Sequence, residues 1–476
     1  MQLQSKQWRV CNYLWVMVWL TCGSLSTTAQ NSLNMQLLGH YNDTSLAKNG
    51  TQIWNDVMGW HDTATGREYL IAGTTDSIYF FDITDPSQLK ICASFGGTNV
   101  KCINRDYYPY QHYLYAVSDQ CENLGNLQIF DMQYLPDSVV KVYESDSLGA
   151  LTHSIFIEQK SKRMYMHLNK VPNKITGQLD RNPMDIVSLE NPTHPVKIGS
   201  IKFPAPYQSV RVHESYVRND TAYCSGETAG LFIFDVRQAD TPVLISAIIP
   251  PYPQNAYNHS SWLDSSGRYL LFCDETPAGV GMKIYDLKDI TSPRIVGEPF
   301  KAEGSPHNSF WMGRYAYTSM YYGGLHVYDL NRLDSPVLGA FYDTYPQSYT
   351  GGYQGCWGVW PFLPSGVILA SDMQNGLFIF KTTEHLAINE KELGHIQLNT
   401  YPNPFIEKFS FTIAAKHQQE ANLAIYNLQG KLVLQKSTTL FAGANTLTQE
   451  LVHPPGMYFI KLTTNDVVYT ARVIKQ

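Results

Sequence analysis

A short apolar motif recurs along this sequence and limits the folds that the chain can adopt. GLFIFD occupies residues 230–235, and GLFIFK occupies residues 376–381. Looser copies, most of which end on aspartate, bring the total to seven, at or around residues 82, 131, 185, 235, 286, 329 and 381. Successive copies are 43–54 residues apart, a period that is too long for a helical hairpin repeat and has room for several strands.

The segments around each copy predict further strands. After most copies, a turn with proline precedes a second apolar run, as in LDSPVLGAFY at residues 333–342. Before each copy, apolar residues alternate on both sides of a polar turn, as in WLDSSGRYLLFC at residues 262–273, which is the pattern of half-buried antiparallel strands. The repeated aspartate can accept hydrogen bonds from amides two residues on, so it is predicted to support a turn. Each period therefore holds four strands.

A four-stranded sheet of this length has two faces to cover and cannot bury both alone. Seven such units arranged radially cover one another, so the sequence predicts an all-β chain built on a seven-bladed β-propeller. The run MQLLGHY at residues 35–41 resembles the segment that follows the other copies, whereas the seventh copy has none behind it. We therefore expect the N-terminal strand to complete the last blade and to hide an exposed edge.

The N-terminus predicts export. Lys6 and Arg9 precede an apolar stretch from about Val10 to Cys22, and small residues follow through Ala29. This is the pattern of a secretory signal peptide over residues 1–29, and the stretch is too short for a spanning helix. The mature chain is thus expected to contain no transmembrane segment. The formal net charge of −6 gives no reason to expect nucleic acid as a partner.

An exported protein can form disulfides. Six cysteines remain after removal of the signal peptide, too few for a disulfide framework in so large a domain. Cys224 and Cys273 lie inside predicted strands, where a small buried hydrophobic role is expected. The predicted pair is Cys102 with Cys121.

Beyond Lys381 the pattern changes. A connector over residues 382–397 leads to short alternating strands over residues 398–476, about the length of a small Ig-like β-sandwich. YPNPF at 401–405, GMYFIKL at 456–462 and the basic ending ARVIK occur in this segment, which resembles the C-terminal sorting domain of type IX secretion substrates of the Bacteroidota. The resemblance implies passage through the type IX secretion machinery, then release or attachment at the cell surface.

The segment over residues 30–381 carries a second resemblance. Its motifs include GWHDTATGREYLIAGTTDSIYFFDITDP at residues 59–86 and HSSWLDSSGRYLLFCDE at 259–275. They resemble LVIVD repeats, in the order found in the choice-of-anchor B family, in which one propeller is joined to different anchoring tails. The third repeat departs from the pattern because NKVPNKITGQLDRNP is inserted before MDIV. The resemblance implies the fold and a surface location but no reaction.

Candidate site residues come from the ends of strands that share one face of a propeller. When the seven repeats are aligned with one another, the residues at the starts of their first strands are Trp54, Cys102, His153, Ser209, His259, His307 and Trp357. The loops after the second strands carry carboxylates, among them Asp119, Glu227, Asp274, Glu275 and Asp372. Imidazoles beside carboxylates and aromatic rings could hold a divalent metal ion or a polar ligand at the channel mouth. The alternative is that each histidine bonds the next blade's backbone and each carboxylate caps a turn.

Two functions of different class follow. The first is a binding module for an extracellular protein or glycan, because a propeller is a rigid disc with variable loops. The second is a metal-assisted hydrolase or lyase, with His153, His259 and His307 as ligands and Asp274 or Glu275 as the base. A purely architectural surface role is a third alternative. HExxH, GxSxG and P-loop motifs are absent from the sequence.

Overall fold

The computed structural model describes residues 32–300, 304–347, 353–383, 394–398, 400–415, 417–427, 431–464 and 467–476. The predicted signal peptide, residues 1–29, lies outside this part of the chain. The chain divides into two compact units, Met1–Leu386 and Ala387–Gln476. All elements in the described residues are strands, so the all-β prediction is confirmed. None of the described residues belongs to a helix that could cross a membrane.

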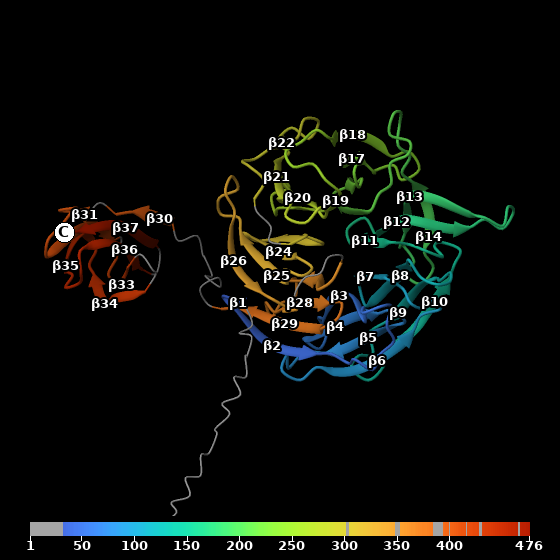
Figure 1. The fold of residues 1–476 in the computed structure, drawn as a ribbon, viewed down its shortest axis with the longest axis horizontal. Coiled ribbons are helices and arrows are strands. Elements are labelled where there is room, and N and C mark those ends of the chain that lie inside the picture. Colours follow the sequence, from blue (N-terminus) through green and yellow to red (C-terminus); the bar gives the residue numbers. More distant parts are fainter. Residues whose placement is uncertain are drawn as a thin grey trace, which may run out of the picture. The chain divides into compact units, whose positions relative to one another are not determined.

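Within the described residues, the first unit contains seven antiparallel sheets that follow one another around a ring (Figure 1). Neighbouring first strands contact one another from β3 through β23, and β27 closes on β3. These strands line the centre of the ring and are β3 (Trp54–Asp62), β7 (Asn104–Tyr110), β11 (Ser154–Glu158), β15 (Glu214–Arg218), β19 (Asn258–Leu263), β23 (Ser309–Met312) and β27 (Cys356–Trp360).

Each first strand forms a hairpin with a second strand, which returns to the same face of the ring. The second strands are β4 (Arg67–Thr74), β8 (Tyr113–Asp119), β12 (Arg163–Pro172), β16 (Thr221–Ser225), β20 (Tyr269–Asp274), β24 (Tyr315–Ser319) and β28 (Ile368–Asp372). The start of a first strand and the end of a second strand are therefore close together. For example, Asn258 of β19 pairs with Asp274 of β20.

The recurring motif forms the third strand of each sheet. The third strands are β5 (Ser77–Asp82), β9 (Leu127–Asp131), β13 (Leu179–Ser188), β17 (Leu231–Asp235), β21 (Lys283–Asp286), β25 (Leu325–Asp329) and β29 (Gly376–Thr382). Phe232 and Phe234 pack against the third sheet, whereas Leu231 and Ile233 pack against the fifth. Successive side chains of a strand point to opposite faces, so one motif fills the core on both sides of its sheet. Each fully buried side chain of this kind contributes about 1.5–3 kcal/mol.

The repeated aspartate has the predicted structural role. Its Oδ1 accepts a hydrogen bond from the amide two residues on at Asp82, Asp131, Asp235, Asp286 and Asp329. The third sheet differs from the sequence alignment, which used Asp185 as its copy. Ser188 ends β13 there, and the Glu190 amide donates to its Oγ at 3.4 Å.

Outer strands complete the sheets. They are β6 (Lys90–Gly96), β10 (Val140–Ser145), β14 (Val196–Ser200), β18 (Val243–Ile248), β22 (Arg294–Ile295), β26 (Val337–Tyr342) and β2 (Met35–Tyr41), and β1 (Ser32–Leu33) adds to β26. Strand β2 pairs with β29 from Met35 opposite Thr382 to Tyr41 opposite Leu377. The N-terminal strand therefore closes the ring as predicted.

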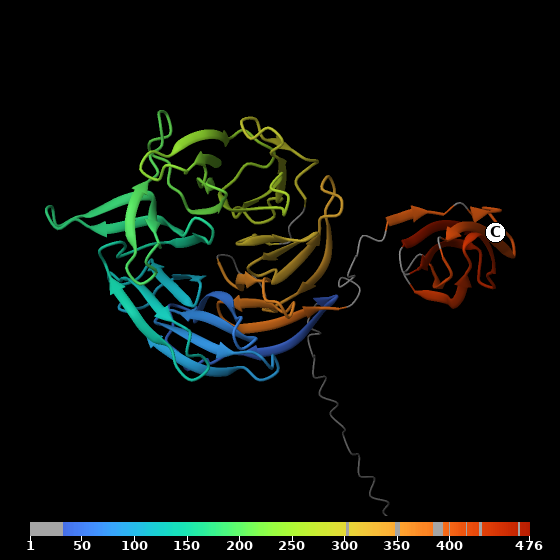
Figure 2. The same ribbon diagram turned by 180° about the vertical axis from the view of Figure 1, so that it is seen from behind.

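The insertion in the third repeat lengthens one hairpin. Strands β12 and β13 stay paired out to Pro172 and Leu179, and the hairpin projects from the ring in Figures 1 and 2. Lys170 and Arg181 are cross-strand partners on this extension. The segment that departs from the repeat pattern thus adds two basic residues beside the channel mouth.

The second unit consists of strands with a core of its own. These are β30 (Gly394–Gln397), β31 (Thr400–Tyr401), β32 (Lys408–Ala415), β33 (Gln419–Asn427), β34 (Leu432–Leu440), β35 (Gly443–Glu450), β36 (Gly456–Thr463) and β37 (Val467–Lys475). They form a five-stranded and a three-stranded sheet around Phe409, Phe411, Ile425 and Val473. Part of the connector predicted over 382–397 lies outside the described residues, and Gly394–Gln397 differs from the prediction because it pairs with β37.

Candidate functional site

A row of four imidazoles lies at the mouth of the central channel. His153 and His213 stand directly before β11 and β15, His259 is the second residue of β19, and His307 lies two residues before β23. Ring centroids are 4.2 Å apart from His153 to His213, 4.4 Å from His213 to His259, and 4.3 Å from His259 to His307. The row ends on Trp357, whose ring is 4.9 Å from that of His307. The structure thus brings together the three predicted histidines and Trp357.

The fourth histidine was missed by the sequence alignment, which put Ser209 at this position. Ser209 instead lines a hollow at the channel mouth, beside the third and fourth sheets. The hairpin turn at Asn219 and Asp220 is a better reference point for aligning this repeat. Counting back from each turn, the five-residue strands β11 and β15 are both preceded by histidine, so alignment on the turn finds His213.

The imidazoles also connect neighbouring sheets. The Nε2 atoms of His153 and His213 are 3.0 Å apart, and His307 Nδ1 donates to the backbone oxygen of Trp357 at 2.9 Å. Burial lowers the pKa of His213 to about 4 and that of His307 to about 3. Burial, with the other imidazoles, places the pKa of His259 well below its usual value. These three rings are therefore neutral at neutral pH.

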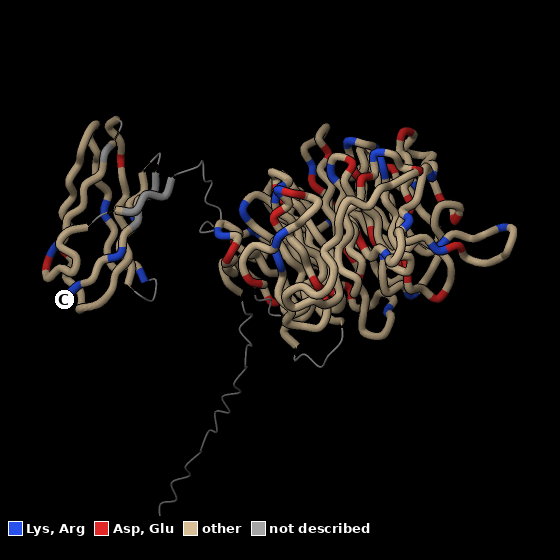
Figure 3. The backbone as a smooth tube through the Cα atoms, turned by 90° about the horizontal axis from the view of Figure 1, so that it is seen from above, with Lys and Arg blue, Asp and Glu red and all other residues tan. Residues whose placement is uncertain are grey.

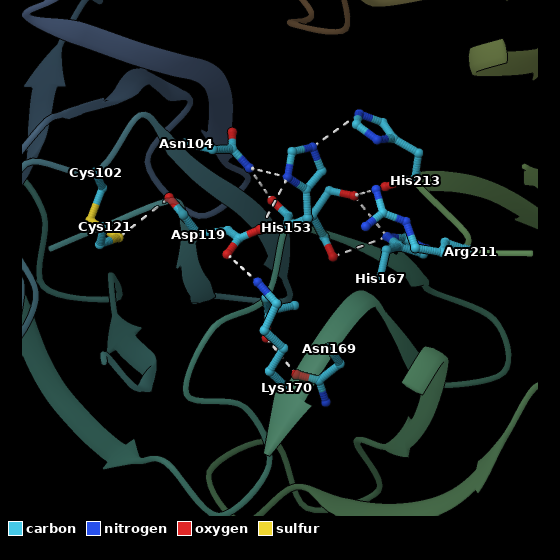
Figure 4. A network of polar contacts seen from close by, with 12 residues as sticks. Cys102, Asn104, Asp119, Cys121, His153, His167, Asn169, Lys170, Arg211 and His213 are labelled. Atoms are coloured by element: carbon cyan, nitrogen blue, oxygen red, sulfur yellow. Dashed lines mark hydrogen bonds and ion pairs between the residues drawn. A yellow bond between two sulfur atoms is a disulfide. The ribbon is translucent and has the colours of Figure 1, made fainter. Parts of the chain in front are cut away.

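Two of the predicted carboxylates lie beside this row, each with a cation. Asp119 accepts from Lys170 Nζ at 2.9 Å and lies 3.6 Å from His153 Nδ1 (Figure 4). Glu227 accepts from Arg211 Nη2 at 2.6 Å and lies 3.8 Å from His213 Nδ1. Burial opposes ionisation, but these polar partners outweigh it. They hold the pKa of Asp119 well below its usual range and lower that of Glu227 to about 2.

Three other predicted residues are placed in the sheets, where their contacts are structural. Asp274 forms a 2.8 Å ion pair with Lys283, and both side chains are fully buried. Asp372 accepts from Thr344 Oγ1 at 2.8 Å and from the amides of Gln374 and Asn375. Trp54 packs in a core cluster and donates to Asn42.

Glu275 belongs to the channel mouth instead. Its carboxylate groups with His259 and His307, and one potential ligand atom from each lies within 4.8 Å of the others. Tyr321 donates to Glu275 Oε1 at 2.6 Å. Burial raises the pKa of Glu275 to about 7 in spite of this bond. Two imidazoles and a carboxylate are donors that suit divalent transition metals.

A small chamber of about 20 Å³ lies next to the imidazole row and also meets Asp56, Asp106, Glu214 and Asn308. Removal from bulk water raises the pKa of Asp56 to about 6 and that of Glu214 to about 8, the latter helped by the charges of Asp56 and Glu275. The same four residues border a second cavity whose remaining lining includes the aromatic rings of Tyr107, Tyr108, Phe156, Tyr216, Trp262, Phe310 and Trp360. The channel is thus polar near its mouth and aromatic further in. Asp106 and Glu214 lie beyond the positions that were aligned at the strand starts, so the sequence did not single them out.

A larger hollow of about 490 Å³ opens at the mouth beside the third and fourth sheets. Its basic residues are Lys170, Arg181 and Arg211, and its other lining residues include Asp119, His153, His213, Tyr257, Gln120, Asn182 and Gln208. Cys102 and Cys121 form a disulfide in the adjacent loop region (Figure 4). Elsewhere on the first unit, basic and acidic residues are interspersed (Figure 3).

Comparison with known proteins separates the two units. Residues 399–476 match the secretion system C-terminal sorting domain. The structure is similar to the β-propeller domain of Cps50 (Swd1) from Myceliophteria thermophila, with 12% identity, a TM-score of 0.48, and coverage of 73% of this chain and 100% of that chain. A comparison with curated proteins finds no match. The sorting domain marks the protein as a substrate of type IX secretion, which is exported to the cell surface or the extracellular space.

Proposed function

We propose that this protein is an exported seven-bladed β-propeller of the LVIVD-repeat, choice-of-anchor B kind from the Bacteroidota. The propeller spans residues 30–381, a connector spans residues 382–397, and an Ig-like sorting domain spans residues 398–476. Its function is to bind an acidic glycan at the channel mouth. The hollow of about 490 Å³ carries this proposal, since its size is within the range of small-molecule sites.

The charges of the hollow favour an anionic ligand. Lys170 and Arg211 are matched by Asp119 and Glu227. Arg181 is exposed and has no ion pair with the described residues. A guanidinium binds a carboxylate or a sulfate with two parallel hydrogen bonds. One unmatched arginine therefore supports recognition of an acidic group.

The remaining polar lining suits a sugar. Gln120, Asn182 and Gln208 offer side-chain amides, each with a donor and an acceptor, beside the ring of Tyr257. Sugar hydroxyl groups need both kinds of partner. An exported protein also meets extracellular polysaccharides, many of which carry uronic acids or sulfates. Acidic glycans therefore fit this hollow better than neutral glycans.

Calorimetric titration of the full chain tests the proposal. The ligands are oligogalacturonate, oligoalginate, a heparin fragment and a neutral malto-oligosaccharide of similar length. We expect binding of an acidic oligosaccharide that weakens with salt, and a loss of about tenfold or more in Arg181→Ala. The matched control is Lys162→Ala, in an exposed ion pair with Glu190, which should bind like the wild type. Equal binding of the neutral sugar, or full affinity in Arg181→Ala, would contradict the proposal.

A further inference from the structure

We propose that His259, Glu275 and His307 bind one divalent transition-metal ion, with zinc as the reference ion. The site lies between the fifth and sixth sheets. His259 belongs to β19, Glu275 directly follows β20, and His307 precedes β23. The inference depends on these three residues and not on the glycan hollow.

The geometry brings three donors together in a closed environment. One potential ligand atom from each residue lies within 4.8 Å of the others, and the residues are 4%, 6% and 7% exposed in chain order. Around a tetrahedral zinc ion, with ligands about 2.1 Å from the metal, neighbouring ligand atoms are separated by about 3.4 Å. Small side-chain rotations therefore suffice to enclose an ion.

The surrounding contacts orient the donors in the way that metal ligands require. His307 Nδ1 donates to the Trp357 carbonyl at 2.9 Å, so its Nε2 carries the free lone pair. Tyr321 holds one oxygen of Glu275 at 2.6 Å, which leaves the second oxygen as a donor. A bond from the second ring nitrogen to a carbonyl, and a hydrogen bond to the ligating carboxylate, are the usual outer contacts of a metal site.

His259 differs from His153 and His307 in its hydrogen bonding. It is 4% exposed and lies near the backbone of His307, but its Nδ1 makes no hydrogen bond of normal geometry with the described residues. The nearest acid is Glu214, whose Oε2 is 3.6 Å away and also lacks a hydrogen bond. A metal at the other ring nitrogen favours a proton on Nδ1, facing Glu214. This is the order carboxylate, histidine, metal that is common around zinc.

The charge and the donor types favour a transition metal. Among the described residues, no lysine or arginine forms an ion pair with Glu275, so the metal is the cation that would match it. Imidazole nitrogens suit zinc, cobalt and nickel better than calcium or magnesium, which prefer oxygen. Two histidines and one glutamate form a known zinc ligand set that leaves one position for water.

The ligand set differs from the three histidines that the sequence predicts. His153 is 9% exposed, and both of its ring nitrogens already have partners. Its Nε2 faces His213 at 3.0 Å, and its Nδ1 faces Asn104 and Asp119. His153→Gln is therefore a control from the same row that should leave metal binding intact.

The experiment uses the full chain after treatment with a chelator. Zinc binding is measured by competition with a chromophoric chelator, and cobalt binding by visible absorption. We expect one equivalent of zinc and a cobalt spectrum with d–d bands. Affinity should fall by more than about 100-fold in His307→Gln and by at least about tenfold in Glu275→Gln. His153→Gln and Arg181→Ala should bind zinc with an affinity within about threefold of the wild type, because substitutions outside the ligand set usually have small effects.

The wild type alone can overturn the inference, whether or not the variants fold. Absence of stoichiometric zinc and cobalt binding at neutral pH excludes the site. Circular dichroism in chelator shows whether each variant is folded before its affinity is compared. Unchanged affinity in folded His307→Gln and Glu275→Gln, or an equal loss in His153→Gln, excludes this ligand set. Arg181→Ala separates the two proposals, because it affects glycan binding and leaves zinc binding unchanged.

Discussion

The two sides of the channel mouth use the same residue types in opposite electrostatic states. Beside the third and fourth sheets, Asp119 and Glu227 each face a histidine and are each bonded to a cation, Lys170 or Arg211. Beside the fifth and sixth sheets, Glu275 faces two histidines and is bonded to a tyrosine hydroxyl group. The pKa of Glu227 is lowered to about 2, whereas that of Glu275 is raised to about 7.

At this mouth, the charge partner of a carboxylate therefore determines what the carboxylate can bind. A buried carboxylate with a cation at bonding distance is ionised and already matched, so it builds the wall of a site. A buried carboxyl group without a cation has a raised pKa, and an incoming positive charge stabilises its ionised form. The first side therefore suits an anionic ligand next to a fixed network, and the second suits a metal ion.

The largest expected effect comes from removing a matched cation. Lys283→Met leaves Asp274 fully buried without its partner, so the free energy of unfolding should fall by about 3–5 kcal/mol. Urea denaturation followed by tryptophan fluorescence measures this change in the first unit, since the chain has no tryptophan after Trp360. The double variant Asp274→Asn with Lys283→Met should recover most of the loss. A fall in the free energy of unfolding of about 1 kcal/mol or less, the value for an exposed ion pair, would contradict this expectation.

A smaller effect is expected from neutralising an unmatched carboxyl group. Burial raises the pKa of Asp372 to about 7, so the fold favours its protonated form. The stability from this preference is complete below the unfolded pKa of 3.8 and is lost as the pH rises through about 7. The free energy of unfolding of Asp372→Asn, relative to that of the wild type, should therefore rise by about 2 kcal/mol between pH 4 and pH 8. This value is estimated from about 1.36 kcal/mol per pKa unit and is reduced to allow for relaxation of the fold.

Thermal or urea unfolding of both proteins across this pH range checks the prediction for Asp372. The Asn side chain can still accept from the amides of Gln374 and Asn375, so the turn should persist. A stability difference that does not change with pH would show that Asp372 is ionised in the fold throughout this range.

The smallest effect is expected from removing a matched, partly solvated carboxylate. Burial opposes ionisation of Glu227, but His213 and Arg211 lower its pKa to about 2 from the ordinary value of 4.5. Glu227→Gln should lower the free energy of unfolding by about 1 kcal/mol at pH 7, since solvent screens such ion pairs. This difference is present above pH 4.5 and shrinks as the pH falls toward 2. Urea midpoints at pH 7, 5 and 3.5 measure it, and a difference that grows with acid would contradict the assignment.

Local patterns were sufficient to predict much of the architecture. Alternation of apolar residues predicted the strands, and the aspartate turns and the closing strand at Met35–Tyr41 were found as expected. These features depend on residues close in sequence, or on a period repeated often enough to average out local ambiguity. The third repeat was aligned on Asp185 rather than Ser188 because its insertion hides the strand end.

The candidate site was predictable only in part. His153, His259, His307 and Trp357 repeat at one position of the period, and they meet at the channel mouth. Asp274 and Glu275 are adjacent in sequence and equally acidic. One pairs with buried Lys283 and the other faces the channel, because neighbouring residues on extended chain point to opposite sides.

Local sequence pattern was sufficient to predict the period, the strand content, the structural role of the motif aspartates and the sorting signal. The folded structure was needed to show which carboxylates meet a cation, how His213 completes the imidazole row, and that the β12–β13 extension brings Arg181 to the hollow. Two of these contacts, Lys170 with Asp119 and His153 with His213, join residues 51 and 60 positions apart. Their energies are set by burial and distance, which a one-dimensional pattern does not contain.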